Sequence, residues 1–213
     1  MIEQILKNLV WLGHDGFCLS AAGKIIYFDP FRLSGVAKPA DIIFVTHEHY
    51  DHCSPDDIAK LVKAGTVIIT EPMSAAKLKN DWEVQSMRPG EHRQIGDIGV
   101  TAVPAYNTNK KFHPKENNWL GFVIEIAGVK IYHAGDTDYI PEMKDIDADI
   151  ALLPVSGTYV MTAQEAVSAA TDINPQVAIP MHYGSLVGTP ADGPEFMHAV
   201  AGQVRVELLT AHP

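Results

Sequence analysis

Short apolar runs alternate with segments of helical periodicity along the chain, a pattern typical of mixed α/β proteins. Runs of mainly apolar residues predict strands at 24–29, 41–46, 66–70, 99–103, 120–126, 129–133, 150–155, 177–181 and 204–209. The dipeptide Ala127-Gly128 between two of these runs is a hairpin signal. We therefore expect antiparallel pairing in the middle of the chain.

Capping residues predict helices between several strands. Ser54 can cap a helix in which Pro55 takes the first position and which Gly65 ends. The segment Thr162-Ala163-Gln164-Glu165 fits a capping box at the start of another helix. Further helices are expected near residues 74–79 and 194–200. Because β/α units lie at both ends of the chain, two packed sheets with helices outside would accommodate the pattern; periodicity alone indicates a mixed α/β domain.

Length and charge narrow the class of protein. The 213 residues predict one domain, residues 1–213, because a typical domain has about 150 residues. Apolar residues make up 46% and charged residues 20%, which excludes a disordered chain. The net charge of −10 argues against a nucleic-acid partner, since such partners require a basic surface.

Other features indicate the compartment. The two cysteines, Cys18 and Cys53, are too few for a disulfide framework. The sequence contains no apolar stretch of about 18 residues, so we expect no membrane span. The first eight residues carry Glu3 and lack the apolar core of a signal peptide. Together these features predict a cytoplasmic protein.

The segment Thr46-His47-Glu48-His49-Tyr50-Asp51-His52 concentrates metal-binding side chains directly after a predicted strand. In an extended chain His47 and His49 point to the same side and can share one metal. Asp51 and His52 follow as the chain turns and can hold a second metal beside the first. Imidazole and carboxylate suit zinc, iron or manganese better than calcium. The alternative is a solvated polar loop, which accounts poorly for so dense a set of ligands after a buried strand.

The pattern His47-x-His49-x-Asp51-His52 resembles the signature of the metallo-β-lactamase-fold superfamily. Three further segments agree with it in order and spacing, at residues 11–17 (WLGHDGF), 134–137 (AGDT) and 180–183 (PMHY). The first is similar to a motif of the branch that contains ascorbate-6-phosphate lactonase and related metal-dependent hydrolases. The resemblance implies an αββα sandwich of two mixed sheets, with the metals at one edge between the sheets.

The resemblance also implies two divalent metal ions, most simply Zn²⁺, with Mn²⁺ or Fe²⁺ as alternatives. Their ligands would be His47 and His49 for the first metal, Asp51, His52 and His182 for the second, and Asp136 between the two. Water held between metals about 3.5–4 Å apart would be hydroxide near neutral pH and would attack the substrate.

The chain departs from the family pattern at the third ligand of the first metal. The family usually has a histidine at the end of the strand that corresponds to residues 101–105, where this chain has Ala105-Tyr106-Asn107. The next histidine along the chain is His113. We expect the loop to fold back so that His113 fills the position, because an open position would weaken the first metal site. Alternatively, His113 lies on the surface and the first metal is weakly held or absent.

Catalytic roles are expected for side chains beside the metals. Asp51 could orient the attacking water or take its proton. Tyr183 could donate to a developing oxyanion or merely pack. His14 could contact the substrate or a metal ligand, or form only a structural hydrogen bond. Asp29 is expected to orient a ligand histidine, and His133 to be structural.

The remaining basic and histidine residues have less specific interpretations. The lysines 110, 111 and 115 flank His113 and could meet an anionic substrate, although a solvated loop is the commoner explanation. The histidines expected on the surface are His92, His198 and His212.

We therefore expect a binuclear metal-dependent hydrolase acting on a small-molecule ester, lactone or phosphodiester. One alternative is a small-nucleotide phosphodiesterase. Another is a non-catalytic metal- or ligand-binding protein, motivated by the absent histidine near Tyr106. Neither a nucleic acid nor a membrane is expected as a partner, whereas assembly into a homo-oligomer would be in keeping with the related branch.

Overall fold

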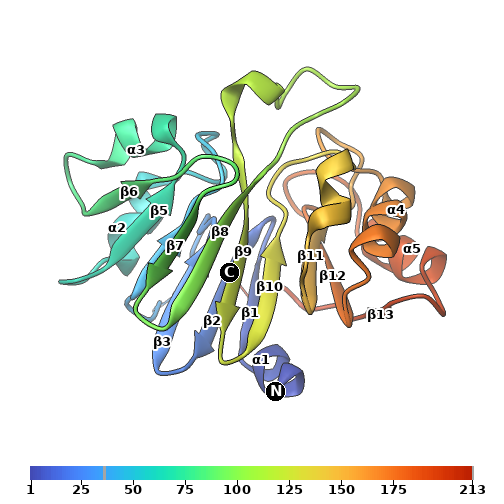
Figure 1. Ribbon diagram of the computed structural model, residues 1–213, viewed down its shortest axis with the longest axis horizontal. Coiled ribbons are helices and arrows are strands. Elements are labelled where there is room, and N and C mark those ends of the chain that lie inside the picture. The colour runs from blue at the N-terminus through green and yellow to red at the C-terminus, as the bar shows by residue number, and fades with distance from the viewer. Residues whose placement is uncertain (36, 213) are drawn as a thin grey trace.

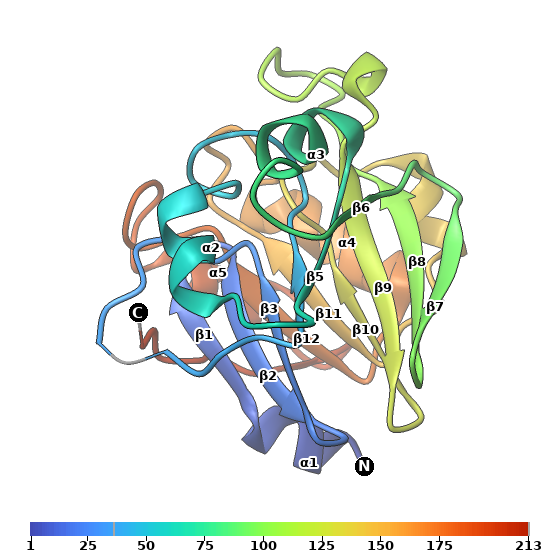
Figure 2. The same cartoon turned by 90° about the vertical axis from the view of Figure 1, so that its left-hand side faces the viewer.

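The computed structural model describes residues 1–35 and 37–212 and folds them into two β-sheets with helices outside (Figures 1 and 2). The strands of the first sheet are β1 (Leu9–Gly13), β2 (Gly16–Ala21), β3 (Lys24–Phe28), β4 (Ile42–Phe44), β5 (Val67–Thr70) and β6 (Val84–Ser86), in that order. Those of the second are β7 (His92–Ile95), β8 (Ile98–Pro104), β9 (Leu120–Ile126), β10 (Val129–His133), β11 (Ile150–Pro154), β12 (Val177–Met181) and β13 (Arg205–Val206). The second sheet runs in simple order from β7 at one edge to β13 at the other.

The helices are α1 (Ile2–Lys7), α2 (Pro55–Leu61), α3 (Pro72–Leu78), α4 (Ala163–Ile173) and α5 (Asp192–Ala199), with short 3₁₀ turns η1 (Lys115–Asn117) and η2 (Pro141–Asp145). Helices α4 and α5 lie over β11 and β12, and α2 and α3 lie beside the first sheet (Figure 1). No helix in the described part of the chain is long and apolar enough to cross a membrane.

Alternate side chains of the first sheet enter two different apolar clusters. On β4, Phe44 points between the sheets, where its ring centroid lies 5.0 Å from that of Phe122 on β9. Its neighbour Ile43 points the other way and packs in a cluster with Ile58 of α2 and Leu78 of α3. Because successive strand residues face opposite sides of a sheet, this alternation produces the helix–sheet–sheet–helix layers. The expected αββα sandwich of two mixed sheets is confirmed.

Strand direction brings the ends of several strands to one edge. Strands β3 to β6 are parallel, as are β10 to β13, whereas β7 to β10 pair antiparallel. The middle of the chain is therefore antiparallel, as the hairpin signal predicts. Since parallel strands end at the same edge, residues that directly follow β3, β4, β10, β11 and β12 can converge there.

Several boundaries differ from the sequence-based expectation. The predicted strand 204–209 is ordered as a strand only at Arg205–Val206. Helix α2 ends at Leu61 instead of continuing to Gly65, because Val62 adopts an extended backbone. Helix α3 begins earlier than expected, because the buried Glu71 side chain caps it by accepting from two backbone amides. The sequence pattern gave no signal for α1, β6 or β7, all of which are short.

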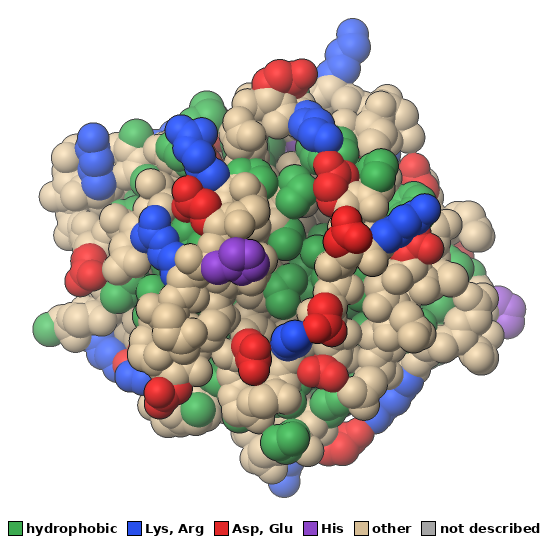
Figure 3. All heavy atoms as spheres, in the orientation of Figure 1, with side chains coloured by type: hydrophobic (Ala, Val, Ile, Leu, Met, Phe, Trp, Pro, Cys, Tyr) green, Lys and Arg blue, Asp and Glu red, His purple; other side chains and the backbone are tan. Residues whose placement is uncertain are grey.

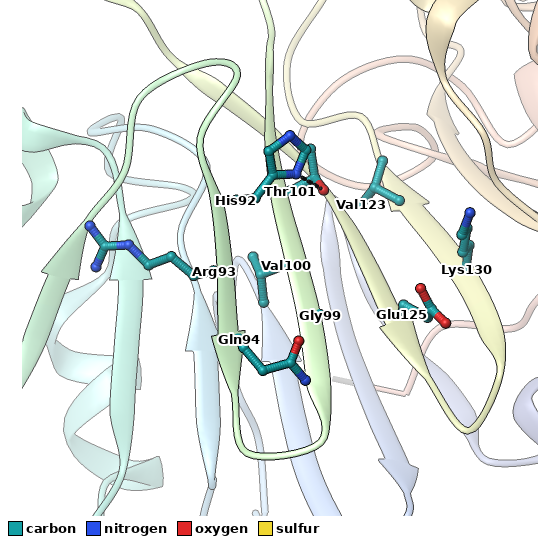
Figure 4. Close-up of a pocket in the computed structure, with 9 residues that line it drawn as sticks. All are labelled: His92, Arg93, Gln94, Gly99, Val100, Thr101, Val123, Glu125 and Lys130. Carbon is teal, nitrogen blue, oxygen red and sulfur yellow. Dashed lines mark hydrogen bonds between the residues drawn. The ribbon is translucent and has the colours of Figure 1, made fainter.

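The outer face of β7 to β10 carries a shallow hollow of about 420 Å³ (Figure 4). The hollow is lined by both polar and apolar side chains. On the face of the protein shown in Figure 3, lysine and arginine side chains lie among acidic ones. The one histidine that lines the hollow, His92, donates to or accepts from the Thr101 hydroxyl over 2.8 Å. A hollow with one histidine lacks the ligands for a metal centre, so the candidate site lies elsewhere.

Asp57 joins α2 to the loop that follows β3. One carboxylate oxygen accepts from the Arg32 amide (2.8 Å) and the other from the Leu33 amide (3.0 Å). Ser54 and Lys60 also donate to this carboxylate. Burial would raise the pKa of Asp57, but these hydrogen bonds outweigh it and lower the pKa.

We expect Asp57→Ala to lower the free energy of unfolding by about 2–3 kcal/mol, because two backbone amides lose their acceptor. Urea denaturation followed by circular dichroism measures this. A carboxyl with a lowered folded-state pKa stabilises above its ordinary pKa, and that contribution is lost as the pH falls through the lowered value. The difference between the two proteins should therefore shrink in acid. The exposed neighbour Asp56 is the control: its change to alanine should cost less than about 0.5 kcal/mol, and an equal cost would contradict the role of Asp57.

Candidate metal centre

Loops at the end of strands from both sheets bring histidine and carboxylate side chains together. His47, His49 and His52 follow β4, His113 comes from the loop between β8 and β9, Asp136 follows β10, and His182 follows β12. Gly135 shapes the turn before Asp136: it has φ +63°, and a Cβ there would lie 2.8 Å from the Leu120 carbonyl oxygen. Glycine is required for so close an approach, and it sets Asp136 between the sheets.

One cluster consists of His47, His49 and His113. The ligand atoms of the three side chains lie within 4.8 Å of one another. The rings surround Trp119, whose centroid lies 4.7 Å from those of His47 and His49 and 5.4 Å from that of His113. The structure thus places His113 beside the two histidines of the motif, as the fold-back of the loop requires; coordination of a metal by it stays a prediction.

Two sets of hydrogen bonds hold the loop that carries His113, one made by Asn107 and the other by Asp138. The Asn107 carboxamide oxygen accepts from the His113 amide (3.0 Å) and lies 3.1 Å from His113 Nδ1. The Asn107 amide in turn donates to the His113 carbonyl (2.7 Å). Further along, the buried Asp138 carboxylate accepts from the Thr108 amide (2.8 Å) and from the Asn107 carboxamide (3.1 Å). The loop position therefore depends on Asp138, two residues after Asp136.

A second cluster consists of Asp15, His52, Asp136 and His182, again with ligand atoms within 4.8 Å of one another. The Asp136 carboxylate lies 3.4 Å from His52 Nε2 and 3.4 Å from His182 Nε2. It also lies 3.1 Å from Nε2 of His113 in the first cluster. Asp136 consequently joins the two clusters, which is the geometry that a bridging ligand needs.

Four of the five histidines in the two clusters, all but His49, are oriented through Nδ1. The Nδ1 atom of His47 lies 3.0 Å from the Thr46 hydroxyl, and that of His52 lies 2.8 Å from the Asp29 carboxylate. The Nδ1 atom of His182 lies 3.0 Å from the Ser156 hydroxyl, and that of His113 lies 3.2 Å from the Tyr159 carbonyl oxygen. Such partners fix the ring and direct Nε2 into the cluster, where that of His47 lies 2.9 Å from His49 Nδ1. Asp29 contacts a histidine of the cluster, as the sequence led us to expect.

Half of the buried polar side-chain atoms that lack a hydrogen-bond partner within the described residues belong to these two clusters. They include both carboxylate oxygens of Asp15, Oδ1 of Asp136, and Nε2 of His52 and of His113. Burying such atoms without a partner is costly, so their concentration in one place calls for a ligand that is itself positively charged. Nitrogen and carboxylate donors of this kind fit divalent zinc, iron or manganese.

Electrostatics divide the site into neutral and charged groups. Burial lowers the pKa of His47 and of His49, which keeps both rings neutral, the form that binds a metal. Burial would likewise lower the pKa of His52, but Asp136 and Asp29 outweigh it and raise that pKa. Burial alone would raise the pKa of Asp136, yet His182 and His52 bring it well below its ordinary value. The Asp136 carboxylate is therefore charged.

Asp51 is placed differently from the other expected ligands, and its coordination of a metal stays a prediction. The carboxylate of Asp51 lies 3.2 Å from His14 Nε2 and belongs to none of the ligand groups found in the described residues, whereas Asp15 joins the second cluster. The reason is local: Asp51 lies in a turn after His49 and points toward the buried His14. Sequence reasoning missed Asp15. The available signal was an acidic residue in the otherwise mainly apolar segment 9–19.

His14 is buried and lies among the other site histidines. Its ring centroid is 4.2 Å from that of His182, and its ligand atoms form a group with those of His52 and His182. Of the roles left open for His14, contact with metal-ligating side chains is the one this placement favours.

The position of Tyr183 does not match the catalytic role considered for it. Its ring stacks on Trp11 with centroids 5.1 Å apart. A Cβ atom added at Gly193 of α5 would lie 2.5 Å from the Tyr183 hydroxyl, so that hydroxyl points at the helix. Tyr183 is also absent from the lining of the site pocket, and the structure therefore supports the packing alternative.

The other expectations concern residues around the site. His133 is buried and hydrogen-bonds to the Asp15 carbonyl over 2.8 Å, in keeping with a structural role. The histidines at the surface are His92, His198 and His212. In the lysine group, Lys110 pairs with the buried Asp138, and Lys115 pairs with Glu142.

The clusters open into a pocket of about 380 Å³. The described residues that line it are His49, Tyr50, Asp51, Phe112, His113, Asp136, Tyr159, Leu186 and Val187. The pocket thus combines metal-binding groups with apolar and aromatic side chains, as small-molecule sites commonly do.

Comparison with known proteins agrees with this geometry. Residues 8–182 match the beta-lactamase superfamily domain. A UPF0173 metal-dependent hydrolase of Thermoplasma acidophilum is 38% identical over 92% of this chain and 92% of its own length. Another, from Archaeoglobus fulgidus, is 34% identical and covers 97% of this chain and 96% of its own.

Solved structures show the same fold. The crystal structure of a metal-dependent hydrolase from Parabacteroides distasonis superposes with a TM-score of 0.87 at 33% identity, covering 96% of this chain and 93% of its own. A metallo hydrolase from Ignicoccus hospitalis superposes with a TM-score of 0.79 at 25% identity, over 96% and 95% of the two chains. The likeness therefore extends over nearly the whole of each protein.

We expect Asn107→Ala to weaken metal binding by about 10- to 100-fold, because His113 loses the acceptor that orients it. Competition with a chromophoric zinc chelator measures the affinity. The exposed Asn109 of the same loop is a matched control, and Asn109→Ala should retain the wild-type affinity. Equal zinc affinities in Asn107→Ala and wild type would show that Asn107 does not position a ligand.

Proposed function

The chain belongs to the metallo-β-lactamase superfamily of metal-dependent hydrolases, and we propose that it hydrolyses a small-molecule ester or lactone with two divalent metal ions. One observation carries the proposal: two clusters of metal-binding side chains are joined by Asp136, which lines a pocket together with His49 and His113. Zinc is the simplest choice of metal, with manganese or iron as alternatives. When bound, such ions lower the pKa of water toward 7 and polarise the bond to be cleaved.

The first metal would be held by His47, His49 and His113, and the second by Asp15, His52 and His182, with Asp136 between them. The four ligand histidines other than His49 are fixed by a hydrogen bond at Nδ1, and the two carboxylates are buried in the cluster. This rigidity reduces the cost of assembling the site before the substrate binds.

Asp51 is suited to orienting a water molecule. Burial would raise its pKa, but contact with His14 and the charge of His52 lower it to about 2. A carboxylate this weak as a base remains ionised and accepts a hydrogen bond, while it removes a proton poorly. Because Asp51 also lines the pocket, its place supports the orienting role over that of general base.

The non-catalytic alternative rested on an open position near Tyr106. Tyr106 is buried, and its hydroxyl donates to Glu142 over 2.7 Å, while His113 lies beside His47 and His49. A complete first cluster favours a catalytic metal centre over a vestigial one. The phosphodiesterase alternative shares this centre and differs only in the substrate.

Metal content and hydrolysis test the proposal together. We expect about two metal ions per chain by elemental analysis, with hydrolysis of p-nitrophenyl acetate. His49→Ala should lose metal and lower kcat/KM by about 100-fold or more, because one of three ligands is gone. The exposed His92 supplies the control, and His92→Ala should keep both metal and activity. Less than one metal per chain after loading with zinc, manganese and iron, with no turnover of esters, lactones or phosphodiesters, would refute a hydrolase.

A further inference from the structure

Exposed aromatic side chains gather at the mouth of the candidate site. Tyr50, Phe112 and Tyr159 are 67%, 54% and 41% exposed, and all three line the pocket. Every other aromatic side chain of the described residues is buried or only partly exposed. Since exposed apolar surface is unfavourable in water, its concentration at one opening indicates a ligand that covers it.

Each of these three aromatic side chains contacts another aromatic ring. Phe112 and Tyr159 meet edge to face with centroids 4.4 Å apart. Tyr50 meets Phe31 in the same way at 5.8 Å. Leu186 and Val187 add aliphatic surface to the pocket lining. An apolar group entering the pocket would therefore contact aromatic and aliphatic surface before it reaches the metal-binding groups.

The pocket offers no side-chain cation to an anionic substrate. Its described lining contains neither lysine nor arginine. Lysines nearby are already paired: Lys110 with Asp138, and Lys115 with Glu142. Lys111, beside Phe112, is exposed and has no ion pair within the described residues, so it is the lysine of this loop that could serve an anion.

We propose that the site selects a neutral ester or lactone whose acyl portion is apolar or aromatic and packs against Phe112, Tyr159 and Tyr50. The inference rests on the proposed hydrolase function and specifies its substrate class. An anionic substrate is the alternative that the test below distinguishes. Tyr159 contributes to the site through two of its parts. Its side chain lines the pocket, and its carbonyl oxygen lies 3.2 Å from His113 Nδ1.

Hydroxamic acids test the proposal by binding instead of by turnover, because they coordinate a divalent metal through two oxygens. The probes are acetohydroxamate, benzohydroxamate and succinohydroxamate, titrated calorimetrically into the zinc-loaded protein. We expect benzohydroxamate to bind at least about tenfold more tightly than acetohydroxamate, a difference of about 1.4 kcal/mol. Succinohydroxamate, which carries a carboxylate, should show no such gain.

Three variants locate the preference. In Phe112→Ala and in Tyr159→Ala the advantage of benzohydroxamate should fall to about twofold or less, because the ring contacts are lost. Acetohydroxamate should bind these variants as it binds wild type, which shows that the zinc remains in place. Lys111→Ala is the matched control and should keep the full preference for benzohydroxamate.

An equal preference for benzohydroxamate in all variants would overturn the inference. So would tightest binding of succinohydroxamate that disappears in Lys111→Ala. If acetohydroxamate binds and p-nitrophenyl acetate is hydrolysed without any preference for an apolar group, only the inferred substrate class fails. If the protein binds neither zinc nor any hydroxamate, the hydrolase proposal fails and this inference fails with it.

Discussion

The buried carboxylate of Asp136 is the charge around which the site is arranged. It lies within 3.4 Å of imidazole nitrogens from His52, His113 and His182, which come from three separate parts of the chain. Desolvation makes a buried carboxylate unfavourable unless opposite charge is close by. The two sheets must therefore bring their strand ends together accurately, because any strand that ended elsewhere would leave this charge uncompensated.

That requirement explains why polar residues around the ligands are buried in so apolar a fold. Asp29, at the end of β3, accepts from the Thr46 amide and hydroxyl and also contacts His52, so one carboxylate ties a strand end to a ligand. Asp138 does the same for the loop that carries His113. Hydrogen bonds of this kind are worth most where water is excluded, and they fix ring orientations that packing alone would leave free.

The sequence predicts the parts of this arrangement that depend on near neighbours. The capping box from Thr162 to Glu165 and the motif after β4 could be recognised because spacing along the chain determines both. The partner of Asp51 and the direction of Tyr183 could not be predicted, since they depend on His14 and on Gly193 of distant elements. Asp15 escaped notice for the same reason: its neighbours in the cluster are His52, Asp136 and His182.

The loop between β8 and β9 carries one side chain of the candidate metal centre and one of the pocket mouth. Successive residues 112 and 113 differ in environment: Phe112 is 54% exposed at the pocket mouth, whereas His113 is 1% exposed beside Asp136 (Figure 2 shows the loop above the sheets). A shift of the backbone here would move both side chains, because the backbone joins them directly. The bonds from Asn107 and Asp138 hold the backbone of this loop and leave the exposed ring unconstrained by them. A substitution at position 112 can therefore alter the pocket wall and keep the position of His113, as long as the hydrogen bonds from Asn107 and Asp138 remain.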